Sequence, residues 1–205
     1  RVPFDPAMPV DTDWDLGIDP MAVRFSQTTR SGEVRLIHYY EDVGGGMELA
    51  IKAVKGQMPN PGNDPKVDAT NRRRASYTYG AHWGPHDIET TEISSGKTRR
   101  KIAFDLGLSF RVTPRGDVQD GITAAQFILS RCWFNEPTTE RGLECLLHYR
   151  RTWQQKLNQF SSTPVHDWAS HGADAFRGLA VRHRTPVAEK EKQKKQQQQS
   201  VGQWT

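Results

Sequence analysis

The sequence predicts an α/β fold in which helices flank a central, five-stranded mixed sheet. Short runs with strand-like alternation come first, and stretches with helical spacing then alternate with further strand-like runs. The 205 residues are 35% hydrophobic and include 6 Trp, 8 Phe and 5 Tyr, which is enough to fill one core. No run approaches the roughly 20 apolar residues of a membrane-spanning helix. The sequence therefore excludes a helical integral membrane protein.

The first three strands are expected at 10–17, 21–28 and 33–40. The turns between them contain Gly-Ile-Asp-Pro and Arg-Ser-Gly, which are typical of an antiparallel meander. A helix is then expected over 44–56, because its apolar residues recur at helical spacing. The remaining predicted elements are a strand over 77–84, a helix over 98–107, a strand over 108–114, and helices over about 118–131, 139–158 and 166–182.

Two segments are expected to lie outside the core. Residues 57–76 contain three Pro and a run of three Arg, which favours a long loop or a mobile hairpin. Residues from about 184 onward are rich in Gln and Lys and nearly free of apolar side chains, which indicates disorder. We therefore expect a folded domain over 1–182 and a basic, Gln-rich tail over 183–205. The chain begins with Arg and shows no secretion signal, as expected for an intracellular fragment of a longer protein.

The net charge of +4 originates in the tail. From residue 181 onward, Lys and Arg exceed Asp and Glu by 4, so residues 1–180 are neutral. Any contact of the folded part with nucleic acid must therefore come from local basic clusters. Two clusters are candidates for DNA binding, and their members are Arg72, Arg73 and Arg74 in the first and Lys97, Arg99 and Arg100 in the second.

Two other classes of site are excluded. Cys132 and Cys145 cannot form a disulfide framework or a four-cysteine zinc site, so we expect them to be buried free thiols. The Ser-Ser-Gly-Lys-Thr segment at 94–98 resembles the end of a phosphate-binding loop, but Thr91 stands where that loop requires Gly. No nucleotide is expected to bind.

Acidic residues stand near the predicted ends of two strands. Asp15 lies near the end of the first strand, and Asp87 follows the fourth strand after Pro85. If these strands are parallel neighbours, both carboxylates reach the same edge of the sheet, where hard oxygen ligands could bind a divalent cation. Asp19 lies in the turn that follows Asp15, and an Asx-turn role before Pro20 explains it equally well. Asp87 is similarly open to a role as a turn cap.

A third candidate group lies in the last predicted helix. His171 and Asp174 are three residues apart, which places them on one face, while Asp167 is suited to cap the helix. This pair could bind a cation and assist proton transfer. A structural role for His171 remains open.

Several segments resemble the C-terminal nuclease domain of tailed-phage terminase large subunits. The resemblance runs in order from about residue 10 to 180 and is most specific in its Pro-His-Asp and Ser-His-x-x-Asp-Ala pieces. The segments are WDLGIDPMAVRFSQ, VRLIHYYEDVGGGM, YGAHWGPHDIE, SGKTRRKIAFDLG, VQDGITAAQFIL and HDWASHGADAFRGLA. The family's N-terminal packaging ATPase has no counterpart in this chain.

The resemblance implies a ribonuclease H-like fold and a Mg²⁺- or Mn²⁺-dependent endonuclease that cuts concatemeric viral DNA during packaging. It maps the three acids of the family's site onto Asp15, Asp87 and Asp174. Our hypothesis is that Asp15 bridges two ions, with Asp87 on one and Asp174 on the other. His171 is similar to the His of the His-x-x-Asp motif in Holliday-junction resolvases, and Asp19 is an auxiliary candidate ligand. Many relatives have Glu where this chain has Asp87, so the metal spacing is expected to differ.

The resemblance also implies a setting and partners. The substrate is double-stranded DNA, and in the full protein the partners are the terminase small subunit and the portal. The location is the host cytoplasm, transiently at the procapsid portal. The loop over 57–76 is a candidate flap that contacts or gates DNA, with a plain surface loop as the alternative.

Two other functions remain open at this point. The first is a resolvase-like or strand-transfer nuclease, which would prefer branched DNA. The second is a module that docks on the motor or portal and has little intrinsic cleavage.

Overall fold

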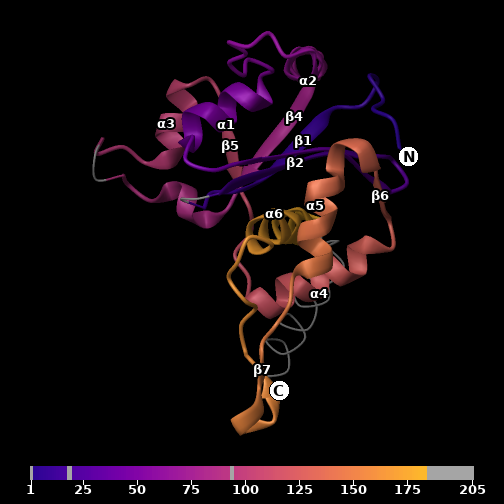
Figure 1. The fold of residues 1–205 in the computed structure, drawn as a ribbon, viewed down its shortest axis with the longest axis vertical. Coiled ribbons are helices and arrows are strands. Elements are labelled where there is room, and N and C mark those ends of the chain that lie inside the picture. Colours follow the sequence, from indigo (N-terminus) through magenta and orange to yellow (C-terminus); the bar gives the residue numbers. More distant parts are fainter. Residues whose placement is uncertain (1, 18–19, 93–94, 184–205) are drawn as a thin grey trace, which may run out of the picture.

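The computed structural model describes residues 2–17, 20–92 and 95–183. A mixed sheet with strand order β5-β4-β1-β2-β3-β6 forms its centre (Figure 1). The three middle strands are antiparallel, whereas β4, β5 and β6 add in parallel to their neighbours. The strands are β1 (Val10–Asp15), β2 (Met21–Thr28), β3 (Val34–Asp42), β4 (Tyr79–Gly84), β5 (Phe110–Val112) and β6 (Cys132–Phe134).

Helices cover both faces of this sheet. Figure 1 shows α1, α2 and α3 on one side and α4, α5 and α6 on the other, with a small β7–β8 hairpin projecting away from the sheet. No helix of the described ranges is long and apolar enough to cross a membrane. The helices are α1 (Gly46–Val54), α2 (Pro65–Ala75), α3 (Arg99–Asp105), α4 (Val118–Leu129), α5 (Glu136–His148) and α6 (Ser170–Arg182), and the hairpin strands are β7 (Trp153–Gln154) and β8 (Gln159–Phe160).

The central strand β1 has one apolar face and one acidic face. Val10 and Trp14 pack into the main core cluster together with side chains of α1 and α3. Asp11, Asp13 and Asp15 alternate with them, so their carboxylates project toward the opposite layer of helices. The alternation in this short strand thus separates the core from a row of acids.

The C-terminal end of α6 is anchored on this acidic row. Arg182 donates to both carboxylate oxygens of Asp13 at 2.6 and 2.9 Å, and to Asp11 at 3.2 Å. Asp13 is only 1% exposed, and burial raises its pKa despite the opposing effect of Arg182. The ion pair therefore fixes α6 along β1 at a site where neither charge is solvated.

A second buried cation ties the helices to β2. Arg24, which pairs with Asp13 across the strands, donates to the carbonyl oxygens of Gly172 at 2.9 Å and Gly142 at 2.7 Å. Its guanidinium also lies near the rings of Tyr39 and Phe176. Backbone carbonyls of both α5 and α6 are thereby held to the sheet.

The structure confirms the α/β class with a mixed sheet and corrects several boundaries. The sheet has six strands rather than five, because residues 132–134 form the edge strand β6 beside β3. The helix expected over 139–158 ends at His148, since Tyr149 is extended and the chain then enters the β7–β8 hairpin. Residues 184–205, which make up nearly all of the expected tail, lie outside the described residues.

The segment 57–76 is not a continuous loop, because α2 occupies its second half. Asp64 caps this helix by accepting a hydrogen bond from the Lys66 N–H at 2.8 Å, and Pro65 stands at the first helical position. Both features are helix-start signals in the sequence. A loop was nevertheless predicted from the sequence, because three Pro within 20 residues are typical of an irregular segment.

The Arg182→Met substitution should lower the free energy of unfolding by about 3–5 kcal/mol, because it leaves the Asp13 charge buried without its partner. Urea unfolding of the two proteins measures the difference. The double variant Asp13→Asn/Arg182→Met is the control and should recover part of the loss, since residue 13 then carries no charge that needs Arg182. A single variant as stable as the wild type would show that the pair does not anchor α6.

Candidate active site

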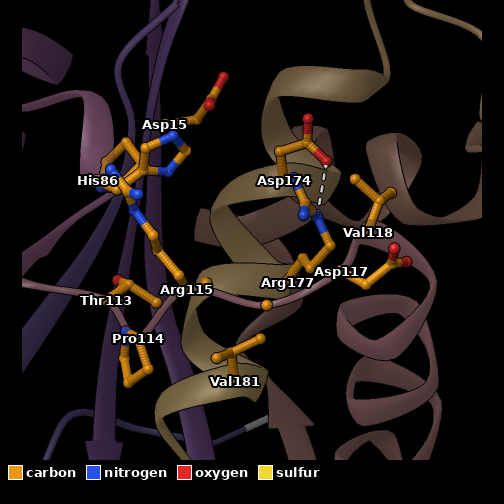
Figure 2. A pocket seen from close by; sticks show the side chains of 13 residues that line it. Asp15, His86, Thr113, Pro114, Arg115, Asp117, Val118, Asp174, Arg177 and Val181 are labelled. Atoms are coloured by element: carbon orange, nitrogen blue, oxygen red, sulfur yellow. Dashed lines mark hydrogen bonds and ion pairs between the residues drawn. The ribbon is translucent and has the colours of Figure 1, made fainter.

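A pocket of about 390 Å³ opens at the C-terminal ends of β1 and β4 and is closed by α6. Because β1 and β4 are parallel and Asp13 pairs with Trp83, the ends of both strands reach the same edge of the sheet. Acidic and basic side chains line the pocket together (Figure 2). These side chains are Asp15, His86, Arg115, Asp117, Asp174 and Arg177.

Asp15 and His171 form the contact between β1 and the start of α6. The His171 Nδ1 and the Asp15 Oδ2 are hydrogen-bonded at 2.8 Å. Burial raises the pKa of Asp15, and the charges of Asp174 and Asp87 raise it further. The same hydrogen bond raises the pKa of His171. The pair therefore lies where negative charge is in excess.

Gly17 makes room for this contact. A Cβ atom at this position would lie 2.7 Å from the His171 Nδ1 and 2.4 Å from the Pro20 carbonyl oxygen. Any larger residue would therefore push the imidazole away from Asp15. This explains why Gly follows so closely after the acid.

Asp174 faces the pocket one helical turn after His171. Its Oδ1 accepts hydrogen bonds from the Arg177 Nε at 3.1 Å and from the Tyr149 hydroxyl at 3.3 Å. Figure 2 shows the Asp15 and Asp174 side chains on β1 and α6 respectively, with Arg177 directly below Asp174. The two acids thus belong to one pocket although they lie 159 positions apart in the sequence.

Asp87 lies in a short 3-10 helix, His86–Glu89, just after β4. Its Oδ2 accepts from the Arg99 Nη1 at 3.4 Å, and the same nitrogen donates to the Leu16 carbonyl at 3.2 Å. Arg99 therefore links Asp87 to the residue that follows Asp15. The other carboxylate oxygen of Asp87, Oδ1, is buried and has no hydrogen-bond partner among the described residues.

Asp15, Asp87 and Asp174 lie near the same edge of the sheet but do not form a compact cluster of metal ligands. Within residues 2–17, 20–92 and 95–183, no group of three or more His, Cys, Asp or Glu side chains is close enough to hold a metal ion. Each carboxylate instead has its own partner, namely His171 for Asp15, Arg177 for Asp174 and Arg99 for Asp87.

The donor set nevertheless suits a hard divalent cation. Carboxylate oxygens are the ligands that Mg²⁺ and Mn²⁺ prefer. The unpartnered Asp87 Oδ1 and the raised pKa of Asp15 both mark places where a cation would relieve unfavourable electrostatics. Asp19, the auxiliary candidate ligand, lies outside the described residues.

Glu41 is a further acid near this edge, and the sequence pattern did not indicate it. It is in register with Asp15 through Ala22, so it lies on the same face of the sheet two strands away. It accepts from the Tyr39 hydroxyl at 2.7 Å, and its charge contributes to the raised pKa of His171. The predicted strand stopped at residue 40, one residue too early to place this acid on the acidic face.

The three arginines of residues 72–74 differ in their exposure to solvent. Arg72 and Arg73 are exposed on α2, whereas Arg74 is 4% exposed. Its guanidinium lies 2.8 Å from the His38 Nε2 and donates to the Ala53 carbonyl at 3.2 Å. The expectation that Arg74 binds DNA is therefore wrong, because a side chain held this way cannot reach a phosphate.

The second basic cluster consists of side chains that are already paired. Lys97 binds Asp105 at 2.8 Å, and Arg100 binds Glu89 at 2.6 Å. Both side chains are about half exposed, so they remain accessible to a phosphate that competes for them. Arg99 is also paired, with Glu92 at 3.1 Å and with Asp87 at 3.4 Å, and it is the least exposed of the three basic side chains.

The Gly17→Ala substitution should break the His171–Asp15 hydrogen bond, because the added methyl group occupies the space of the imidazole. We expect a loss of about 1–3 kcal/mol in unfolding free energy, as for other overpacked sites. The imidazole NMR signal of His171 should shift as it does in Asp15→Asn. Gly62→Ala is the matched control, since no atom lies within 4 Å of a Cβ there. Unchanged stability and an unchanged His171 signal in Gly17→Ala would contradict this account.

Comparison with known proteins supports the fold. No protein-family model matches the chain, and no curated protein matches it. Among solved structures it is similar to the nuclease domain of the large terminase of bacteriophage SPP1, crystallised with bound Mn. The TM-score is 0.53 at 12% sequence identity, over 85% of this chain and 86% of that one. The resemblance seen in the sequence is thus confirmed for the fold, which this chain shares with that large-terminase nuclease domain.

Proposed function

We propose that this chain is a divalent-metal-dependent endonuclease domain that hydrolyses phosphodiester bonds of double-stranded DNA during phage genome packaging. The observation that carries the proposal is the joint placement of Asp15 and Asp174 in one pocket, with Asp87 close enough to perturb Asp15 electrostatically. The fold shared with a nuclease domain that was crystallised with Mn supports the same assignment.

Asp15, Asp87 and Asp174 would hold Mg²⁺ or Mn²⁺, two ions in our proposal, with His171 and Asp19 as further candidate ligands. Such ions, when bound, lower the pKa of water and stabilise the charge that develops on the leaving oxygen. His171 and Tyr149 orient Asp15 and Asp174 through the hydrogen bonds described above.

The basic side chains of the pocket would bind the substrate. Arg115 and Arg177 line the same pocket as the acids, so they can donate to the non-bridging oxygens of a phosphate. Figure 2 shows Arg115 extending toward His86, which also lines the pocket. These contacts would hold the phosphodiester beside the carboxylates without reading any base.

Further basic residues outside the pocket would position the duplex. Arg72 and Arg73 on α2 and Lys97 and Arg100 near α3 are exposed or half exposed. Arg99, which contacts Asp87 and the Leu16 carbonyl, is a further candidate for DNA binding. The proposal includes cleavage of concatemeric viral DNA in the host cytoplasm, with the terminase small subunit and the portal as partners of the full protein.

Plasmid nicking tests the proposed activity. With Mn²⁺ or Mg²⁺ the wild type should convert supercoiled plasmid into nicked and linear forms, and a chelator should stop the reaction. Asp15→Asn and Asp174→Asn should each slow nicking by about a hundredfold or more, because changes at metal sites commonly cost that much. Glu48→Gln, which removes an exposed acid of α1 that does not line the pocket, is the control and should cleave normally. Undiminished plasmid degradation by both pocket variants would refute the assignment.

Metal binding can be tested without measuring cleavage. Mn²⁺ at about a hundred times its dissociation constant should stabilise the wild type by about 2.7 kcal/mol. Thermal unfolding with and without the ion measures this effect, and Asp15→Asn should show little of it. Equal stabilisation of both proteins would place the ion elsewhere.

A further inference from the structure

The β7–β8 hairpin connects α5 to α6 and projects from the molecule (Figure 1). Trp153 pairs with Phe160, and Asn158 turns the chain with a left-handed backbone. Backbone hydrogen bonds extend the ribbon toward its base, from the Ser161 N–H to the Thr152 carbonyl and from the Val165 N–H to the Arg150 carbonyl. The segment is therefore an ordered arm.

Large apolar side chains are exposed near the tip of this arm. Trp153, Leu157 and Phe160 are 46%, 63% and 58% exposed, and none belongs to a core cluster. The Trp153 and Phe160 rings contact only edge to face, with centroids 4.9 Å apart. An isolated two-stranded ribbon gains little from displaying such side chains to water, so they mark a contact surface.

The charge of the arm indicates what it contacts. Residues 149–165 contain Arg150, Arg151 and Lys156 but no Asp or Glu. Arg150 is paired with Asp167, and Arg151 donates to the Gln119 side chain, so Lys156 carries the charge at the tip. Cations beside exposed aromatic rings suit a polyanion with planar bases. A second copy of this chain would instead bring like charges together.

Both ends of the arm are fixed to the candidate active site. At its start, the Tyr149 hydroxyl donates to Asp174 in the pocket. At its end, the chain enters α6, where His171 contacts Asp15. A duplex bound at the pocket would therefore extend past a rigidly held arm.

We propose that the arm formed by residues 150–165 binds the DNA duplex that occupies the pocket. Lys156 contacts a phosphate, and Trp153, Leu157 and Phe160 pack against sugars and base edges in a groove. This inference rests on the proposed nuclease function and adds to it a binding surface outside the pocket.

Fluorescence anisotropy with a short labelled DNA duplex, in EDTA to prevent cleavage, tests the proposal. Trp153→Ala/Phe160→Ala should raise the dissociation constant at least about tenfold, given the usual contribution of an aromatic side chain to nucleic-acid binding. Trp133→Ala is the matched control, because Trp133 is 57% exposed on the edge strand β6. It should bind like the wild type. Lys156→Ala should reduce the slope of log affinity against log salt by about 1.

Circular dichroism and thermal unfolding should show that the double variant is folded, since both rings lie outside the core. Wild-type affinity in a folded double variant overturns the arm proposal and points to a protein partner for this surface. Plasmid nicking by the wild type separates the two hypotheses. Nicking together with unchanged affinity rejects only the arm, whereas a wild type that neither binds nor cleaves DNA rejects both.

Discussion

The attachment of α6 to the acidic face of β1 is the constraint on which the rest of the structure depends. The strand presents three aspartates to the helix. Arg182 neutralises two of them at one end, and His171 contacts the third at the other. A helix held at both ends by charged groups has one position along the strand. That position brings Asp174 to the pocket that contains Asp15.

Each of the three carboxylates at this edge of the sheet contacts a basic side chain of the same chain. His171, Arg177 and Arg99 each contact one of the three acids, and each contact also joins two elements or two turns of one helix. A divalent cation would have to compete with these basic side chains for the carboxylates. The occupancy of a metal site here would therefore be sensitive to any change that moves α6.

The positions of the acids could be predicted from the sequence, whereas the side chains that contact them could not. The alternation in β1, the Gly–Pro stop after β4 and the three-residue spacing on α6 follow local rules, so Asp15, Asp87 and Asp174 could be chosen as candidates. The partners of those acids depend on contacts between distant segments, which no local pattern specifies. Arg74 illustrates this, because it looks like part of a surface cluster and is buried beside His38. The β7–β8 hairpin was not predicted either, because its strands are only two residues long and show no apolar alternation.

The most direct test of the central claim is a crystal structure of the protein with Mn²⁺, recorded with anomalous diffraction. We expect anomalous peaks at the edge of the sheet, within coordination distance of the Asp15 and Asp174 carboxylates. Ordered Mn²⁺ elsewhere on the surface, with Asp15 still bound to His171 and Asp174 still bound to Arg177, would contradict it.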